Sequence, residues 1–176
     1  MAGRRILITG CSGAGKSTLL AEMAARGWDT IKEPGRRVIR AEERMGGSGL
    51  PWADRERFCR LCLKIATADW ESVRAGTVLF DRGVVDAALN LKALGQDSPA
   101  EGYLRTFPYD PLLILAPPWE ALFDADAGRK HTFGDALAEY ILISSSLEQL
   151  GYRAEVLPQV PVEARADWLE ALLQAR

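Results

Sequence analysis

The sequence has little of what disulfide-stabilised, membrane-spanning or nucleic-acid-binding proteins need. Its 176 residues include three cysteines and one histidine, which is too few for a disulfide framework. Lys and Arg number 22 against 24 Asp and Glu, a net charge of −2, so no basic excess favours a nucleic-acid partner. No apolar run approaches the roughly 18 residues that cross a bilayer, and the run after Arg4 and Arg5 is too short for a signal peptide. We therefore expect a cytoplasmic protein that binds neither nucleic acid nor a membrane.

Two of the cysteines have a spacing that could indicate a zinc or redox site. Cys59 and Cys62 form C-x-x-C, but no second pair exists and the single histidine, His131, lies far away in sequence. On a helix, residues three apart lie on the same face. We therefore predict that the two thiols are buried as small hydrophobic groups rather than bound to a metal.

The remaining composition is that of an ordinary globular protein, with 48% hydrophobic and 26% charged residues. The length suits one domain spanning residues 1–176. Short apolar segments alternate with helix-like segments, which predicts a three-layer α/β domain with a parallel sheet covered on both faces. The strand-like segments are 4–9, 28–32, 77–80, 112–116 and 153–157, and the helix-like segments are 18–26, 38–44, 53–74, 84–94, 133–150 and 162–174.

A glycine-rich motif follows the first strand-like segment. It fits the phosphate-loop pattern G-x-x-x-x-G-K-[ST], with a strand entering and a helix leaving. Its glycines allow backbone N–H groups to point at phosphate oxygens, and the new helix adds its positive end. We expect Lys16 to reach the β- and γ-phosphates and Ser17 to bind Mg²⁺. The predicted ATP-binding residues are Gly10, Cys11, Ser12, Gly13, Ala14, Gly15, Lys16, Ser17 and Thr18.

An acid and an arginine follow the third strand-like segment. Asp81 stands where phosphate-loop proteins place an acid that positions Mg²⁺; the alternative is a helix N-cap or a solvated strand end. Arg82 either holds a phosphate or pairs with a nearby carboxylate. Because the carboxyl ends of parallel strands lie on one edge of the sheet, both residues should lie on the same edge as the glycine-rich motif.

Glu33 follows the second strand-like segment and is a candidate general base. A carboxylate there could accept the proton of an acceptor hydroxyl in line with the γ-phosphate. The alternative is an acidic residue in a surface turn before Pro34.

The polar segment 124–131 contains two adjacent cations, Arg129 and Lys130. A loop there could cover the triphosphate and bring these cations to the transferred phosphoryl group, where charge stabilisation is needed. The alternative is an exposed charged loop. Trp52 and Trp119 either face a ligand cleft or pack, within the core or between the subunits of a homodimer.

These pieces together resemble the small phosphate-loop kinases, which include nucleoside, nucleotide and ribosylnicotinamide kinases. The Glu-Pro and Asp-Arg pairs resemble the deoxynucleoside-kinase arrangement, which implies that Glu33 is the base and that Arg82 binds phosphate. A resemblance to a bacterial family of predicted phosphate-loop ATPases, often labelled AAA-type, covers nearly the whole chain. Its motifs here are Glu33-x-Gly35-Arg36-Arg37, Leu50-Pro51-Trp52, Asp81-Arg82-Gly83, Leu115-Ala116-Pro117-Pro118-Trp119, Asp126-x-x-Arg129-Lys130 and Gly151-Tyr152…Leu157-Pro158.

The second resemblance implies a kinase-like sheet of strand order 2-3-1-4-5 that uses ATP and Mg²⁺. No arginine-finger or sensor pattern accompanies it, so we do not interpret the label as a ring motor. We expect a kinase that transfers the γ-phosphoryl group of ATP to a hydroxyl of an unidentified small molecule. The catalytic candidates are Lys16, Glu33, Asp81, Arg82, Arg129 and Lys130, with Ser17 and Asp81 at the metal. The alternative is an ATP-dependent switch or slow ATPase that acts on a protein partner.

Overall fold

The chain forms a five-stranded parallel sheet in the computed structural model, which describes residues 3–123 and 132–175. The strand order is β2-β3-β1-β4-β5, as the resemblance implied, and every neighbouring pair is parallel. Parallel neighbours require crossovers, and a helix follows each strand. The strands are β1 (Arg4–Gly10), β2 (Asp29–Ile31), β3 (Thr77–Asp81), β4 (Leu112–Ala116) and β5 (Arg153–Val156).

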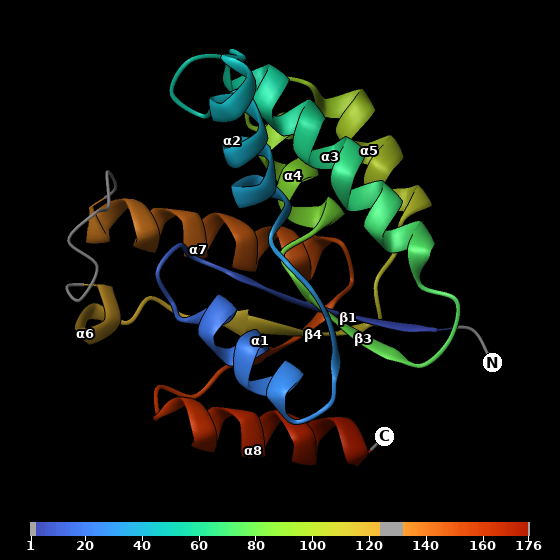
Figure 1. Ribbon diagram of the computed structural model, residues 1–176, viewed down its shortest axis with the longest axis vertical. Coiled ribbons are helices and arrows are strands. Elements are labelled where there is room, and N and C mark those ends of the chain that lie inside the picture. Colours follow the sequence, from blue (N-terminus) through green and yellow to red (C-terminus); the bar gives the residue numbers. More distant parts are fainter. Residues whose placement is uncertain (1–2, 124–131, 176) are drawn as a thin grey trace.

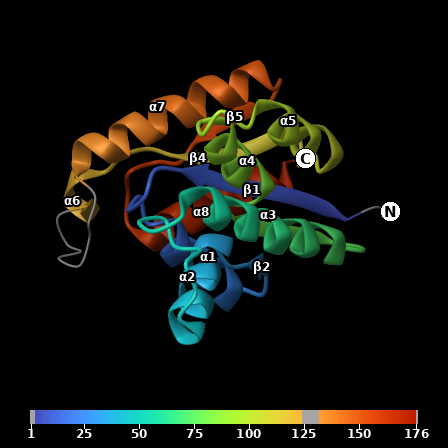
Figure 2. The same ribbon diagram turned by 90° about the horizontal axis from the view of Figure 1, so that it is seen from above.

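Helices cover both faces of the sheet (Figure 1). α1 and α8 lie on one face, and α3, α4, α5 and α7 lie on the other, with α2 packed beside α3 (Figures 1 and 2). The helices are α1 (Lys16–Ala25), α2 (Pro34–Met45), α3 (Arg55–Ser72), α4 (Val84–Lys92), α5 (Asp97–Thr106), α6 (Glu120–Phe123), α7 (Phe133–Gln149) and α8 (Val162–Gln174). The predicted three-layer α/β fold is therefore confirmed.

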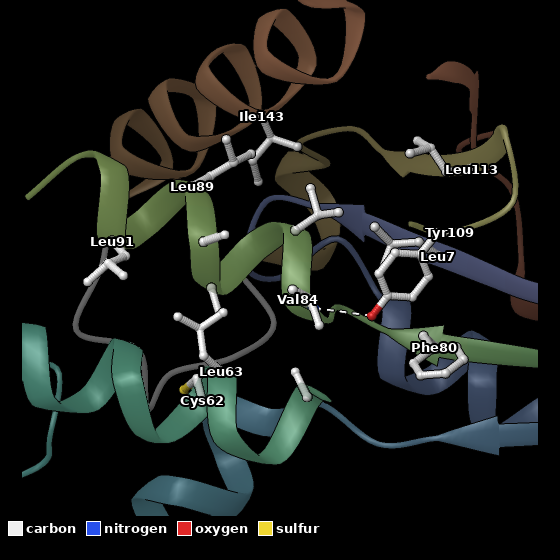
Figure 3. Packing of buried hydrophobic residues seen from close by; sticks show 14 of the residues in the cluster. Leu7, Cys62, Leu63, Phe80, Val84, Leu89, Leu91, Tyr109, Leu113 and Ile143 are labelled. Carbon is white, nitrogen blue, oxygen red and sulfur yellow. Dashed lines mark hydrogen bonds between the residues drawn. The ribbon is translucent and has the colours of Figure 1, made fainter. Parts of the chain in front are cut away.

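Alternating side chains of the central strands pack into two hydrophobic cores, one on each face of the sheet. Ile6 and Ile8 pack against α1 and α8, whereas Leu7 between them packs on the opposite face. This alternation is the normal period of a strand, and burial on both faces explains the continuous apolar run. Figure 3 shows the larger core, in which Leu7, Phe80 and Tyr109 lie together beside Val84 at the start of α4.

The C-x-x-C pair lies in the larger core. Cys59 and Cys62 project from α3 toward the core and are free thiols, and burial raises the pKa of Cys62 to about 12. Within the described residues no group of three or more metal-ligating side chains is found. Both cysteines are buried hydrophobic residues, as predicted.

Three expectations about the elements were wrong. α2 begins at Pro34, not at residue 38, because proline and its fixed φ suit the first turn of a helix. α5 was missed because Pro99 and Gly102 lower its helix propensity; Pro99 is tolerated in the first turn, where an N–H has no partner. β2 and β5 are the edges of the sheet and are partly exposed rather than covered on both faces.

Across the two described ranges, no helix combines the length and the apolar character that a membrane crossing requires.

Candidate functional site

The glycine-rich motif forms the connection between β1 and α1, at the carboxyl edge of the sheet. Gly10 ends β1 with a φ of 121°, and a Cβ there would lie 2.2 Å from the carbonyl oxygen of Ala116. Gly15 has a φ of 75° and precedes α1, which begins at Lys16. Both positions need glycine, because residues with a side chain rarely adopt this conformation. In addition, β4 leaves no room for a Cβ at Gly10, and the side chains of Arg165 and Leu122 leave none at Gly15. The sequence therefore builds the turn that the motif predicted.

Lys16 is buried within this turn. Its Nζ donates hydrogen bonds to the carbonyls of Cys11 at 2.5 Å and Gly10 at 3.4 Å. Burial lowers the pKa of Lys16, and the positive charge of Arg82 lowers it further, while Asp81 opposes both. An anion bound on the turn would favour the charged form of this lysine.

Ser17 and Asp81 are directly joined. The Ser17 hydroxyl donates to Oδ2 of Asp81 at 2.6 Å. Asp81 ends β3 with 2% exposure, and the residue that precedes α4 as its N-cap is Gly83. Asp81 is therefore neither a solvated strand end nor the helix cap, the two alternatives that the sequence left open.

This pair suits a small divalent cation. Oδ1 of Asp81 is buried and has no hydrogen-bond partner in the described part of the chain. Burial raises the pKa of the carboxyl group, although the hydroxyl of Ser17 opposes the shift. A carboxylate and a hydroxyl oxygen are the hard ligands that Mg²⁺ prefers. The residues present thus fit the predicted metal.

Arg82 is the centre of a largely buried ion-pair cluster, in which Asp86 is buried and the other members are partly buried. Its guanidinium lies 2.8 Å from Glu139, 3.3 Å from Asp86 and 3.6 Å from Glu33. Its φ of 57° is unusual for a residue with a side chain. Burial disfavours its charge, but Glu139, Asp86 and Glu33 outweigh that cost and raise its pKa above the ordinary value. Arg82 pairs with carboxylates here, and its role toward a phosphate stays a prediction.

Two members of this cluster were not foreseen from the sequence. Asp86 on α4 is buried; it accepts a hydrogen bond from the Gly83 N–H at 3.0 Å and another from the Thr9 hydroxyl. Its position three residues after Gly83 is a capping signal that could have revealed the structural part of its role. Glu139 on α7 has no local signal, because only the tertiary fold brings it to this edge.

Glu139 connects α7 to the glycine-rich motif. Its Oε2 accepts the backbone N–H of Ser12 at 2.8 Å, while Oε1 pairs with Arg82. Burial alone would raise the pKa of this carboxyl group, but Arg82 and the Ser12 N–H lower it overall. A carboxylate bound to this N–H demonstrates that the turn can hold an anionic oxygen.

Glu33 lies beside the same cluster. It is the N-cap residue of α2, pairs with Arg36 at 2.9 Å, and approaches Arg82 at 3.6 Å. The cavity at this edge has a volume of about 270 Å³. Its lining residues are Ser12, Gly13, Gly15, Lys16, Ser17, Thr18, Glu33, Arg36, Arg82, Leu122 and Arg165. The predicted base and the predicted phosphate loop therefore share one cavity.

The two tryptophans considered as cleft residues differ in position. The ring centroid of Trp119 lies 5.3 Å from the guanidinium of Arg165, which in turn contacts the glycine-rich motif. Trp52 is 55% exposed in the connection between α2 and α3. This connection lies at the end of α2 away from Glu33, roughly 18 Å along a 12-residue helix. Trp119 thus borders the site, and Trp52 does not.

Arg129 and Lys130, together with the whole expected lid segment 124–131, lie outside the described residues. Their predicted roles remain predictions.

A family described as AAA domain matches the chain over residues 5–165. The chain belongs to this family. No curated protein matches it.

Several small P-loop kinases of known structure have the same fold as this chain. Deoxyadenosine kinase from M. mycoides, solved with the products dCMP and dCDP, is 16% identical with a TM-score of 0.67, covering 97% of this chain and 98% of the kinase. Thymidylate kinase from Candida albicans is 12% identical with a TM-score of 0.61, and the match covers 99% of this chain and 92% of that kinase. NadR in complex with NR is 15% identical with a TM-score of 0.68, covering 98% of this chain and 51% of NadR. The fold is therefore that of P-loop kinases.

Proposed function

We propose that this protein is a kinase that transfers the γ-phosphoryl group of ATP to a hydroxyl group of a small metabolite. The observation that carries the proposal is the cavity that Ser17, Glu33 and Arg82 line together. Asp81 lies directly behind Ser17 and accepts its hydroxyl, and Glu33 pairs with Arg82. The first pair suits a metal-bound triphosphate, and the second offers a carboxylate beside a cation for an acceptor. The structural neighbours, which are kinases of nucleosides or nucleotides, are consistent with such an acceptor.

In this proposal, the chain's own residues place the reacting groups. The N–H groups of the turn and Lys16 hold the phosphates, while Ser17 and Asp81 hold Mg²⁺, which supplies charge neutralisation on the β- and γ-phosphates. Glu33 accepts the hydroxyl proton as the acceptor oxygen bonds to the γ-phosphorus. The bond from that phosphorus to the bridging oxygen breaks, and ADP leaves. Arg82, and Arg129 and Lys130 from the expected lid, balance the developing charge.

The test is phosphoryl transfer from ATP across a library of nucleosides, nucleoside monophosphates, sugars and other alcohols. We expect at least one compound to accelerate ADP formation and to acquire one phosphate by mass spectrometry. Glu33→Gln should lower kcat roughly 100-fold or more, the usual range for a lost general base, while ATP binding persists. ADP formation that no acceptor accelerates would count against the kinase.

One observation favours the alternative, an ATP-dependent switch. Glu139 ties α7 to the Ser12 N–H, so a triphosphate on the turn would compete with this carboxylate and could shift α7. A switch should capture a protein partner differently with ATP than with ADP, whereas a kinase should not. The cytoplasmic location and a homodimer stay predictions; fractionation and sedimentation would check them.

A further inference from the structure

Arg165 on α8 is a buried cation that lacks a counter-ion among the residues described. It is 3% exposed, and its Nε has no hydrogen-bond partner within residues 3–123 and 132–175. No carboxylate within the described ranges lies within 4.0 Å of it, and burial lowers its pKa. A buried charge without a partner is costly to keep, so the fold retains this arginine for a reason other than packing.

The contacts of Arg165 are with the glycine-rich motif. Its Nη1 donates to the carbonyl of Ala14 at 3.3 Å, and a Cβ at Gly15 would lie 2.7 Å from the same Nη1. The ring of Trp119 borders the guanidinium on another side. Gly15 is therefore needed not only for its φ but also to let this arginine reach the turn.

The contact of Arg165 with the Ala14 carbonyl also affects the Gly15 N–H, because both groups belong to the same peptide. In a trans peptide the C=O and N–H groups point in opposite directions, and the described peptide bonds include no cis bond. A donor that holds the Ala14 carbonyl therefore fixes the Gly15 N–H on the opposite side of the peptide, away from α8. It also polarises that peptide, which strengthens the N–H as a donor.

We propose that Arg165 is a positioning residue for the phosphate loop: it fixes the Ala14–Gly15 peptide through the Ala14 carbonyl and adds, at the wall of the cavity, a positive charge that bound phosphates neutralise. This inference rests on the proposed function, because it assumes that the turn binds the phosphates of a nucleotide. The ligand group concerned is the polyphosphate, not the base.

The experiment measures binding of ATP and of inorganic tripolyphosphate by calorimetry at several salt concentrations. Arg165→Met removes the charge and keeps much of the bulk. The matched control is Arg26→Met, because Arg26 joins α1 to α8 through Asp167 and Glu170 without touching the turn. We expect Arg165→Met to weaken both ligands by the same factor, roughly tenfold, and to reduce the salt dependence of binding. Arg26→Met should leave both within about twofold.

Equal losses in the two variants would overturn the proposal, because they would indicate a general effect of α8 packing. A loss for ATP but not for tripolyphosphate would overturn it as well, since Arg165 would then act on the base. If Arg165→Met does not fold, Arg165→Lys carries the test. It should weaken tripolyphosphate two- to threefold with the salt dependence kept, and an unchanged affinity would overturn the proposal.

A readout without ligand separates this inference from the proposed function. The amide NMR signal of Gly15 should shift in Arg165→Met and not in Arg26→Met. If wild-type protein binds neither ligand, the proposed function fails, yet a selective Gly15 shift would still support the contact. No Gly15 shift would overturn the positioning role.

Discussion

The glycine-rich turn and the carboxylate cluster around Arg82 lie in one cavity but are built in opposite ways. The turn is one continuous segment, residues 10–17, whose shape comes from its own backbone and from Gly10 and Gly15. The cluster joins Glu33, Asp86 and Glu139 from three helices or their caps, and the partly buried Arg82 pairs with all three. Substitutions in the turn should therefore lower the affinity for ATP most, whereas substitutions in the cluster should lower the free energy of unfolding.

The largest expected effect is on the turn. Lys16→Met removes the buried cation that lies on the loop carbonyls, and ATP affinity should fall roughly 100-fold or more, by analogy with the loss of a preorganised charge contact. Calorimetry measures this, with Lys92→Met as the control because Lys92 is an exposed residue at the end of α4. ATP affinity near the wild-type value in Lys16→Met would contradict the phosphate-loop interpretation.

In the cluster, Arg82→Gln should lower stability in addition to any effect on phosphoryl transfer. It leaves three carboxylates without their shared cation, and the free energy of unfolding should fall by about 3–5 kcal/mol, as when one partner of a buried ion pair is removed. Urea unfolding checks this against Arg60→Gln, which breaks an exposed pair with Glu56 and should cost less than about 1 kcal/mol. Similar losses in both variants would mean that the Arg82 cluster is no more than a surface network.

The backbone next to Arg82 should be almost as sensitive. A Cβ at Gly83 would lie 2.1 Å from the hydroxyl oxygen of Tyr109, and this hydroxyl accepts the N–H of Val84 (Figure 3). Gly83→Ala should therefore lower stability by about 1–3 kcal/mol, the usual cost of overpacking. Gly102→Ala on α5 meets nothing within 4 Å and should raise stability by about 0.5–1 kcal/mol. Thermal unfolding compares the two, and a neutral Gly83→Ala would show that Tyr109 can move aside.

The smallest effect tests the link between the two regions. The pKa of Glu139 is lowered in the folded protein, so its contribution to stability is present above the unfolded value of 4.5 and is lost as the pH falls through the folded pKa. Glu139→Gln should therefore be less stable than wild type by about 1–2 kcal/mol at pH 7, and the difference should vanish at acid pH. Urea unfolding at several pH values measures it. A difference that does not change with pH would mean that the charge of Glu139 does not matter.

Prediction from sequence succeeded where the information is local or periodic. The motif from Gly10 to Ser17 specifies its own turn through contacts between near neighbours. The continuous apolar strands predicted a sheet covered on both faces, which holds for β1, β3 and β4. Strand order came from the family resemblance rather than from any residue pattern.

The missed residues share a physical cause. Glu139 and Arg165 lie on amphipathic helices that carry other charged residues, and on such helices a charge normally faces solvent. Their burial depends on where α7 and α8 lie against the turn, more than 120 residues away in sequence. Nothing in their neighbourhood along the chain distinguishes them from exposed charges.

The sequence by itself determined the phosphate loop, because φ > 0 glycines, a lysine and a serine in fixed order shape a turn through contacts between near neighbours. The tertiary structure alone decided which charges face one another around it. Arg82 pairs with three carboxylates, whereas Arg165 has none among the residues that the structure describes. Both outcomes depend on contacts between distant segments that only the packed sheet and helices bring together.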